Sequence, residues 1–235
     1  MYIFARNINF SRHFFLLSMD SFFKLSMKNI IFDLGGVILN IDYFKTSDAF
    51  KALGGVQFDA IYSQAQQNHL FDDFETGTIS EKVFFDELNT LLGGGYAQKA
   101  LINAWNAMLL DFPLNRIEKL EQLGQKYRIF LLSNTNETHL AAFKTIAEKS
   151  VGYSRFVRCF EQVFYSHEIG ARKPNPHAFW HVLNAGELNP AETLFIDDSA
   201  QHLVGAQECG IQAQLLAKGA EFSDLLNALV DYDFS

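Results

Sequence analysis

The stretch Ile30-Ile31-Phe32-Asp33-Leu34-Gly35-Gly36-Val37 decides the fold that we expect for this chain. An apolar run bounded by glycine is typical of a buried parallel strand, although periodicity alone leaves a helix open. The two glycines allow a sharp turn and bring backbone N–H groups close to a ligand. Asp33 therefore stands at the carboxyl end of a predicted strand, where open α/β sheets bind ligands, unless it only forms the turn.

Length and composition bound the kinds of protein that this chain can be. Its 235 residues suffice for one sizeable domain, or for a core domain with a small insert. Hydrophobic residues make up 49% and charged residues 20%, which is ordinary for a soluble globular protein. The formal net charge of −8 argues against a nucleic-acid surface. Cys159 and Cys209 show no metal or redox spacing, so we expect a cytoplasmic protein without a disulfide.

Residues 1–26 differ in character from the rest of the chain. They are rich in Phe, but the apolar run from Phe14 to Leu17 is too short for a signal peptide or a membrane span. We predict that Met27 is the functional start and that residues 1–26 lie outside the core. An interfacial amphipathic anchor is the alternative, and stable membrane association is not expected.

Two kinds of periodicity follow one another in the remaining sequence. Between residues 44 and 111 the apolar residues recur at helical spacing and glycines separate the segments, which predicts a helical cap of about four helices. Ser80 stands where it would cap one of these helices. Residues 27–43 and 112–235 alternate strands with helices, which predicts an α/β catalytic core with a doubly wound parallel sheet.

Polar side chains follow several of the predicted strands, at the edge of the sheet where parallel strands end. Asp33 closes the first strand, Ser133 and Asn134 the second, and Asp197 and Asp198 the fourth. Taken singly, these side chains are equally well explained as turn formers or as caps of the following helices. Together they place a carboxylate nucleophile, a hydroxyl, an amide and two further carboxylates around one crevice.

The chemistry that suits this set is phosphoryl transfer. Asp33 can attack phosphorus and form an aspartyl phosphate, which splits one hard displacement into two easier steps. Asp33 and Asp198 together can hold Mg²⁺, which prefers oxygen ligands and neutralises a phosphate. Lys173, in the loop after the third strand, and the Ser133 hydroxyl can bind the remaining phosphate oxygens. On its own, a lysine before proline would simply be a solvated loop charge.

Four short motifs resemble those of the haloacid dehalogenase superfamily, and within it those of the phosphatases. They are Phe32-Asp33-Leu34-Gly35-Gly36-Val37, Leu132-Ser133-Asn134, Lys173-Pro174 and Ile196-Asp197-Asp198-Ser199. Three stretches resemble, more closely, the bacterial sugar-1-phosphate (α-glucose-1-phosphate) phosphatases, namely Asp33-Leu34-Gly35-Gly36-Val37, Phe74-Glu75-Thr76-Gly77-Thr78-Ile79-Ser80 and Leu132-Ser133-Asn134-Thr135-Asn136. The resemblance runs from Lys28 to about Leu216. It implies a Rossmann-like core with a small helical cap inserted after the first strand.

The resemblance also implies a role for each matching residue. Asp33 would be the nucleophile, Asp198 and the Gly35 carbonyl would bind the metal, and Asp197 would support it. Residues of the cap would choose the substrate. The implied set has catalytic Asp33 and Lys173, substrate-binding Ser133, Asn134, Lys173 and Gly35, and metal-binding Asp33, Gly35, Asp198 and Asp197, with Mg²⁺ as cofactor.

One position departs from the family's pattern. Most of its phosphatases carry, two residues after the nucleophile, an Asp that protonates the leaving group, and this chain has Gly35 there. General acids contribute roughly 10² to 10⁴ in rate, so either another acid substitutes or the leaving group is undemanding. Asp42, at the root of the predicted cap, is a candidate substitute. His202 stands where the fourth motif often has a carboxylate or amide, which leaves the orientation of Lys173 open.

Other prominent residues have simpler explanations. Arg172 is expected to be a solvated or capping charge. His139 and four other histidines without ligand spacing are expected at the surface or in the cap; the others are His69, His167, His177 and His181. An aromatic stripe is expected to form the cap core, and its members are Phe71, Phe74, Phe84, Phe85 and Trp105.

We therefore predict an Mg²⁺-dependent phosphomonoester hydrolase that acts on a small phosphorylated metabolite, with sugar phosphates favoured. A 2-haloacid dehalogenase is the second hypothesis. Asp197 and Asp198 argue against it, because these carboxylates would repel Asp33 without a cation. A phosphatase-like binding or regulatory module that has lost activity is the third. The sequence names neither the substrate nor the oligomeric state.

Overall fold

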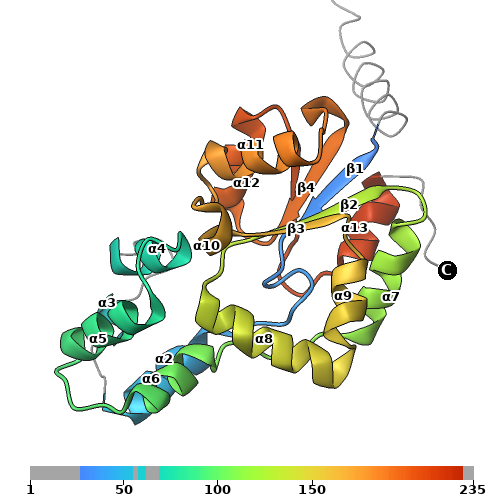
Figure 1. Cartoon of the computed structure of the whole chain (residues 1–235). Coiled ribbons are helices and arrows are strands. Elements are labelled where there is room, and N and C mark those ends of the chain that lie inside the picture. Colours follow the sequence, from blue (N-terminus) through green and yellow to red (C-terminus); the bar gives the residue numbers. More distant parts are fainter. Residues whose placement is uncertain (1–26, 55–57, 62–68, 230–235) are drawn as a thin grey trace, which may run out of the picture.

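The computed structural model describes residues 27–54, 58–61 and 69–229, and a five-stranded parallel sheet forms its centre (Figure 1). The strand order is β3-β2-β1-β4-β5. The strands are β1 (Asn29–Phe32), β2 (Arg128–Ser133), β3 (Gln162–Tyr165), β4 (Thr193–Asp197) and β5 (Gln212–Leu215). The predicted α/β fold with a doubly wound parallel sheet is confirmed.

The first strand, β1, is the central one. It pairs with β2 on one side and β4 on the other, and all four of its residues are buried. A strand that is covered on both faces favours an uninterrupted apolar sequence, which explains the run from Ile30 to Phe32. Phe32 pairs with Ile196 in the register of β1 and β4. The residues that follow, Asp33 and Asp197, therefore emerge side by side at the carboxyl edge of the sheet.

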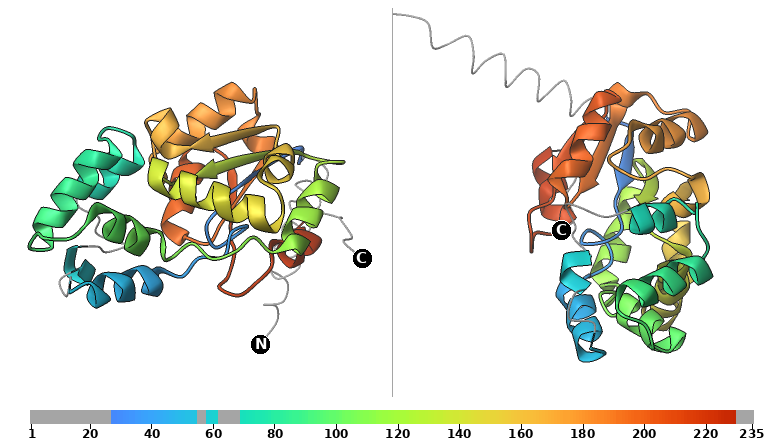
Figure 2. Two further views of the ribbon diagram at one scale, coloured as in Figure 1. Left: turned by 60° about the horizontal axis from the view of Figure 1, so that its bottom comes forward. Right: turned by 90° about the vertical axis from the view of Figure 1, so that its left-hand side faces the viewer.

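Helices cover both faces of the sheet (Figures 1 and 2). One face carries α7 (Leu114–Leu123), α8 (Glu137–Ser150), α9 (Tyr153–Arg158) and α13 (Phe222–Leu229). The other carries α10 (Ser166–Ile169), α11 (Pro176–Ala185) and α12 (Ala200–Glu208), with the 3-10 turn η1 (Pro190–Glu192) before β4. Alternate residues of β1 enter the two apolar cores, Ile30 and Phe32 on one face and Ile31 on the other.

A separate group of helices lies beyond the carboxyl edge of the sheet (Figure 1). It consists of α2 (Tyr43–Ala52), α3 (Phe58–Ile61), α4 (His69–Glu75), α5 (Glu81–Leu91) and α6 (Gln98–Asn106). These helices pack around their own aromatic core, in which Phe74 stacks on Phe84 with ring centroids 4.2 Å apart. The predicted aromatic stripe is part of this core, and Ser80 caps α5 by accepting a hydrogen bond from Val83 N.

Two paired segments connect this helical group to the core. Asn40 N donates to Asp111 O at 2.9 Å, and Asp42 N donates to Met108 O at 2.9 Å. An antiparallel bridge joins Ile41 to Leu109 between them. The entry and exit of the helical group therefore run as one short two-stranded ribbon, which fixes where the group stands relative to the sheet.

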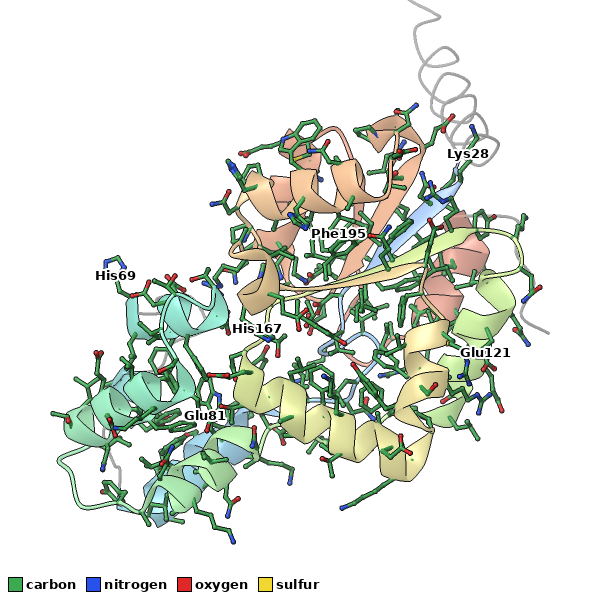
Figure 3. The ribbon with its side chains drawn as sticks, viewed as in Figure 1. Lys28, His69, Glu81, Glu121, His167 and Phe195 are labelled. Carbon is green, nitrogen blue, oxygen red and sulfur yellow. The ribbon has the colours of Figure 1, made fainter. Side chains whose placement is uncertain are left out.

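Further contacts join the helical group to the core near Glu81 and His167, both labelled in Figure 3. Thr138 Oγ1, on core helix α8, donates to Glu81 Oε2 at 2.7 Å. Gly77, with φ 69°, lies against the backbone of α10, because a Cβ there would stand 2.3 Å from His167 O. The end of α4 is therefore seated directly on the core.

The predicted leader, residues 1–26, lies outside the described residues. Both cysteines, Cys159 and Cys209, are free and buried. In the described part of the chain, no helix combines the length and the apolar character that a membrane span requires.

Candidate active site

The ends of β1 and β4 bring three carboxylates together. Oxygen atoms of Asp33, Asp197 and Asp198 lie within 4.8 Å of one another. Asp33 and Asp197 are buried, and Asp198 is exposed. Carboxylates at this separation repel one another unless a cation lies among them.

Lys173 supplies part of the compensating charge. Its Nζ donates to Asp33 Oδ1 at 2.6 Å and to Asp197 Oδ2 at 2.7 Å, and the side chain is fully buried. Burial alone would lower the pKa of Lys173, but Asp197 and Asp33 outweigh burial and raise it, so the lysine stays protonated. The orientation of Lys173, which the sequence left open, is thus set by two carboxylates.

His202 also contacts Asp197. Its Nδ1 donates to Asp197 Oδ2 at 3.0 Å, and Ser199 N donates to Asp197 Oδ1 at 2.7 Å. Burial alone would raise the pKa of Asp197, but Lys173 and His202 lower it to about 2. Asp197 is therefore ionised and fully engaged in hydrogen bonds, which suits a residue that supports the site.

Asn134 fixes the loop that carries Lys173. Its Nδ2 donates to Lys173 O at 2.8 Å, and its Oδ1 accepts from Lys173 N at 2.8 Å. Because both polar atoms of the amide are used, this geometry supports a positioning role for Asn134 beside the substrate-binding role that the sequence predicted. Neither Ser133 nor Asn134 caps α8, because Asn136 does so by accepting from His139 N. The capping explanation for these two residues is therefore wrong.

The turn after β1 needs glycine at its second position. Gly36 has φ 76°, and a Cβ there would lie 2.1 Å from Asp198 Oδ2. Gly35 is less restricted, since a Cβ would stand 3.1 Å from Ile41 Cδ1. The glycine pair thus lets the backbone approach the carboxylates closely.

The donor set fits Mg²⁺. Three carboxylates face one buried ammonium group, and all the acidic ligand atoms are oxygens, which Mg²⁺ prefers. Burial, together with Asp197 and Asp198, raises the pKa of Asp33 to about 7 against the opposing effect of Lys173. Partial burial and Asp197 raise the pKa of Asp198 to about 6. Raised pKa values of this kind indicate negative charge that a further cation would compensate.

This electrostatic arrangement predicts how Mg²⁺ stabilises the protein as pH changes. The metal-free folded chain holds the Asp33 proton more tightly than the unfolded chain does. The contribution of Asp33 to stability is therefore greatest below its ordinary pKa of 3.8 and falls as pH rises through about 7. Because Mg²⁺ binds the ionised carboxylates, its stabilising effect should grow as pH rises over the same range.

We expect Mg²⁺ to raise the Tm only slightly at about pH 5 and most strongly at about pH 8. Thermal unfolding with Mg²⁺ and with a chelator, at several pH values, measures this difference. Asp198→Asn is the matched variant and should lose most of the Mg²⁺-induced rise. A rise that is the same at both pH values would contradict the expectation.

A cavity of about 100 Å³ lies between this edge of the sheet and the group of helices α2 to α6, which we call the cap. Gly35, Ser133 and His202 line it from the core, and Glu75 and Trp105 line it from the cap. Both the core and the helices α2 to α6 therefore line a cavity beside Ser133 and Gly35.

Arg172 joins the loop of Lys173 to the cap. Its Nη1 donates to Asp72, and its Nε lies 2.8 Å from Glu75 Oε2; both acidic residues belong to α4. The expectation of a solvated or capping charge is therefore wrong for Arg172. Burial raises the pKa of Glu75, and Arg172 opposes this effect. Glu75 lies in a stretch that resembles the sugar-1-phosphate phosphatases, but no role was predicted for it.

The expectation that His139 lies at the surface or in the cap is also wrong. This residue belongs to core helix α8 and is buried against the cap. Its ring stacks on Trp105 with centroids 4.9 Å apart. Nε2 donates to Trp105 O at 3.1 Å, so Nδ1 carries no proton and accepts from Asn136 Nδ2 at 3.3 Å. Burial lowers the pKa of His139 to about 4, which keeps the ring neutral.

Asp42, the candidate for the missing acid, caps a helix. Its Oδ1 accepts from Phe44 N at 3.0 Å at the start of α2. Asp42 lines a wider depression together with Gly36 and Asp198. The role of Asp42 as a substitute acid stays a prediction.

A model of one family, the haloacid dehalogenase-like hydrolases, matches residues 27–210. The chain belongs to that family. Among curated proteins, the D-ribitol-5-phosphate phosphatase of Bacteroides thetaiotaomicron is 28% identical over 205 residues, which are 87% of this chain and 99% of the relative.

Solved structures of this family are similar over nearly the whole chain. One is a family enzyme from Bacteroides thetaiotaomicron, an Asp-to-Ala mutant in complex with magnesium and inorganic phosphate. It has a TM-score of 0.79 and 31% identity, and the match covers 85% of this chain and 98% of that one. A predicted family hydrolase from Porphyromonas gingivalis has a TM-score of 0.78 and 27% identity, covering 87% and 98%.

These likenesses agree with the chemistry of the site. The predictions of a haloacid dehalogenase-like phosphatase, of hydrolysis of phosphoric monoesters and of Mg²⁺ as cofactor are confirmed. The relative named above, a D-ribitol-5-phosphate phosphatase, is named for a small phosphorylated compound. The roles of the individual side chains remain predictions.

Proposed function

We propose that this phosphatase hydrolyses the monophosphate of a sugar or polyol in the cytoplasm, through an aspartyl phosphate on Asp33. The observation that carries the proposal is the position of Asp33, which lies next to Asp197 and Asp198 and accepts a hydrogen bond from Lys173. The substrate class draws support from the relative whose name gives D-ribitol 5-phosphate as its substrate. The two free, buried cysteines suit a reducing compartment.

Substrate binding would use the phosphate end of the ligand. Lys173 and the Ser133 hydroxyl donate to phosphate oxygens, and both hydrogen bonds are charge-assisted because the phosphate is ionised. Mg²⁺, when bound by Asp33, Asp198 and the Gly35 carbonyl, supplies neutralisation of the phosphate charge. Asp197 and Asn134 would hold Lys173 in place by its side chain and by its backbone, respectively.

Hydrolysis then proceeds in two displacements. In the first, an oxygen of ionised Asp33 attacks phosphorus, a bond from that oxygen to phosphorus forms, and the bond from phosphorus to the alcohol oxygen breaks. The departing alcohol oxygen takes a proton from solvent. In the second displacement, water attacks phosphorus and gives up a proton to solvent, the bond from phosphorus to Asp33 breaks and restores the carboxylate, and inorganic phosphate leaves. The hydrogen bond from Lys173 favours the ionised form of Asp33, which is the form that attacks.

A panel of phosphate esters with and without Mg²⁺ tests this function. We expect turnover that requires Mg²⁺ and favours sugar and polyol monophosphates over simple alkyl phosphates. A halide-releasing reaction with 2-chloropropionate would instead support the dehalogenase hypothesis. Absence of turnover with every compound would support the inactive binding module.

Because Gly35 provides no general acid, we expect the rate to depend steeply on the pKa of the leaving group. Lys173 and Mg²⁺ stabilise the phosphoryl oxygens, while the departing oxygen must carry its negative charge largely unaided. We expect a strongly negative slope of log kcat against leaving-group pKa across aryl and alkyl phosphates when the chemical step limits the rate. A flat slope under that condition would reveal an acid elsewhere in the site.

Gly35→Asp is the variant that should flatten this slope. The new side chain would stand 3.1 Å from Ile41 Cδ1 at its Cβ, so Ile41→Val in the same chain provides room for it. Poor leaving groups should gain up to roughly 10²-fold in rate, because a general acid is worth that much or more. The single Ile41→Val variant is the control and should keep the steep slope.

A further inference from the structure

Arg116, on α7, is a buried charged residue that the proposed mechanism does not use. It is 8% exposed, and arginine is rarely found at such depth unless its charge is paired. Nε donates to Glu221 Oε2 at 3.0 Å, and Nη2 donates to Glu221 Oε1 at 2.9 Å, so the two side chains form a bidentate ion pair. The third nitrogen of the guanidinium group, Nη1, takes no part in this pair.

Nη1 binds the segment that leads from β1 to the cap. It donates to Asn40 Oδ1 at 3.0 Å and to Ile38 O at 3.4 Å. Ile38 belongs to the loop after β1, residues 33–39, which we call the nucleophile loop; Ile38 N donates to Leu34 O at 2.9 Å within it. Asn40 begins the two-stranded ribbon that carries the cap, residues 40–42 and 108–111. One side chain of the core therefore contacts both the nucleophile loop and the ribbon.

The ribbon is connected to the same loop by a second contact. Asn40 joins the two strands of the ribbon, because its Nδ2 donates to Asp111 Oδ1 at 3.2 Å and its N donates to Asp111 O at 2.9 Å. The next residue, Ile41, lies against Gly35, since a Cβ on Gly35 would stand 3.1 Å from Ile41 Cδ1. The ribbon therefore meets the nucleophile loop at two points, through Arg116 and through the packing of Ile41.

We propose that Arg116 is a positioning residue that holds the ribbon against the nucleophile loop. The cap and Asp33 then keep one relative placement, and a substrate between them meets the nucleophile in a fixed geometry. The planar guanidinium group suits this role, because its rigid fork reaches Glu221 and Asn40 at once, and a lysine ammonium group lacks that fork. The inference rests on the proposed function, in which Asp33 is the nucleophile.

Kinetics and amide hydrogen exchange of Arg116→Met test this role. Turnover of p-nitrophenyl phosphate with Mg²⁺ is measured well below the Tm of each variant, so that folded proteins are compared. We expect Arg116→Met to lower kcat at least tenfold, and Arg116→Lys to recover only part of that loss. Exchange at the ribbon amides of Asn40, Asp42 and Leu110 should accelerate at least tenfold more than exchange in β2, because these amides are bonded across the ribbon.

A variant of the acceptor tests the same contact from the other side. Asn40→Ala removes the partner of Nη1 and leaves the pair of Arg116 with Glu221 in place, so it remains informative if Arg116→Met does not fold. It should also lower kcat and accelerate exchange in the ribbon. In the double variant, the loss of kcat should be clearly smaller than the product of the two single losses, because both changes break one shared contact.

Arg155→Met is the matched control. Arg155 forms a bidentate pair of the same kind with Glu121, near the end of α7, with both hydrogen bonds at 2.7 Å. Loss of this pair should leave kcat within twofold of the wild type and should not change the relative exchange rates of the ribbon.

Several results would overturn the positioning role. If Arg116→Met loses Tm but keeps kcat within twofold, Arg116 only stabilises the core. An equal fall of kcat in Arg155→Met would show that the effect is not specific to the ribbon. Fully multiplicative losses in the double variant would mean that Arg116 does not act through Asn40.

Failure of the proposed function gives a different result. The wild type would then show no Mg²⁺-dependent turnover, or Asp33→Asn would stay active. Hydrogen exchange does not depend on turnover and would still report on the contact between Arg116 and the ribbon. Unchanged relative exchange at the ribbon amides in Arg116→Met and Asn40→Ala would overturn the inference by itself.

Discussion

Replacing Asp33 by Asn is expected to lower kcat by roughly 10⁴ to 10⁶-fold, as the loss of a nucleophile does in other covalent catalysts. The neutral amide oxygen is a poor nucleophile and cannot form an acyl phosphate. Removal of the charge should not harm the fold. Asp33 is one of three carboxylates around a single lysine, and burial and its neighbours already raise its pKa to about 7. The Tm of the metal-free variant should therefore equal or exceed that of the wild type.

The measurement is Mg²⁺-dependent turnover of p-nitrophenyl phosphate together with thermal unfolding. Mass spectrometry of the purified variant excludes deamidation of Asn back to Asp. Asp48→Asn makes the same chemical change at an exposed position of α2 and should leave kcat unchanged. Activity of Asp33→Asn within tenfold of the wild type would remove Asp33 from the nucleophilic role.

The core of the fold was predictable because local sequence patterns determine it. Each buried strand is a short apolar run, and the polar residues that close β1, β2 and β4 mark the carboxyl edge of the sheet. The parallel arrangement then brings Asp33 and Asp197 together by register alone. Short helices were not predicted, because the periodic signal of a helix needs a longer window. Helix α10, for example, spans four residues.

The contacts between cap and core were not predictable from the sequence. Arg172 and Asp72 are 100 positions apart, and their pairing depends on how α4 packs on the loop of Lys173. His139 looked like a surface residue because no local pattern shows that Trp105 covers it. Both errors concern tertiary packing of the cap on the core, where the identity of the partner is set by the fold as a whole. The same packing places Glu75 in the cavity.

Replacing Lys173 by Met is expected to destabilise the metal-free protein by about 3 to 5 kcal/mol at neutral pH, as the breaking of other buried ion pairs does. Met is similar in volume and removes the charge alone. Lys173 is fully buried, and its ammonium group lies 2.6 Å from Asp33 Oδ1 and 2.7 Å from Asp197 Oδ2. Without it, two buried carboxylates face each other with no opposing charge. Turnover should fall by roughly 10² to 10³-fold as well, since a phosphate-binding donor is lost.

The pH dependence of this loss of stability shows whether Lys173 stabilises the protein through its charge or through its packing. In the variant, the folded pKa of Asp33, already raised to about 7, rises further, and that of Asp197 rises from about 2, because Lys173 no longer lowers them. The folded variant therefore binds protons more tightly than the unfolded chain, and its deficit shrinks as pH falls toward about 4. Urea unfolding at several pH values measures this loss of stability. Lys82→Met is the control, because the Lys82 side chain is 79% exposed and its surface ion pair is worth about 0.5 kcal/mol or less. A deficit that is equal at all pH values would mean that Lys173 stabilises the core by its packing. Mg²⁺ should restore part of the loss at neutral pH, because it brings positive charge to the same carboxylates.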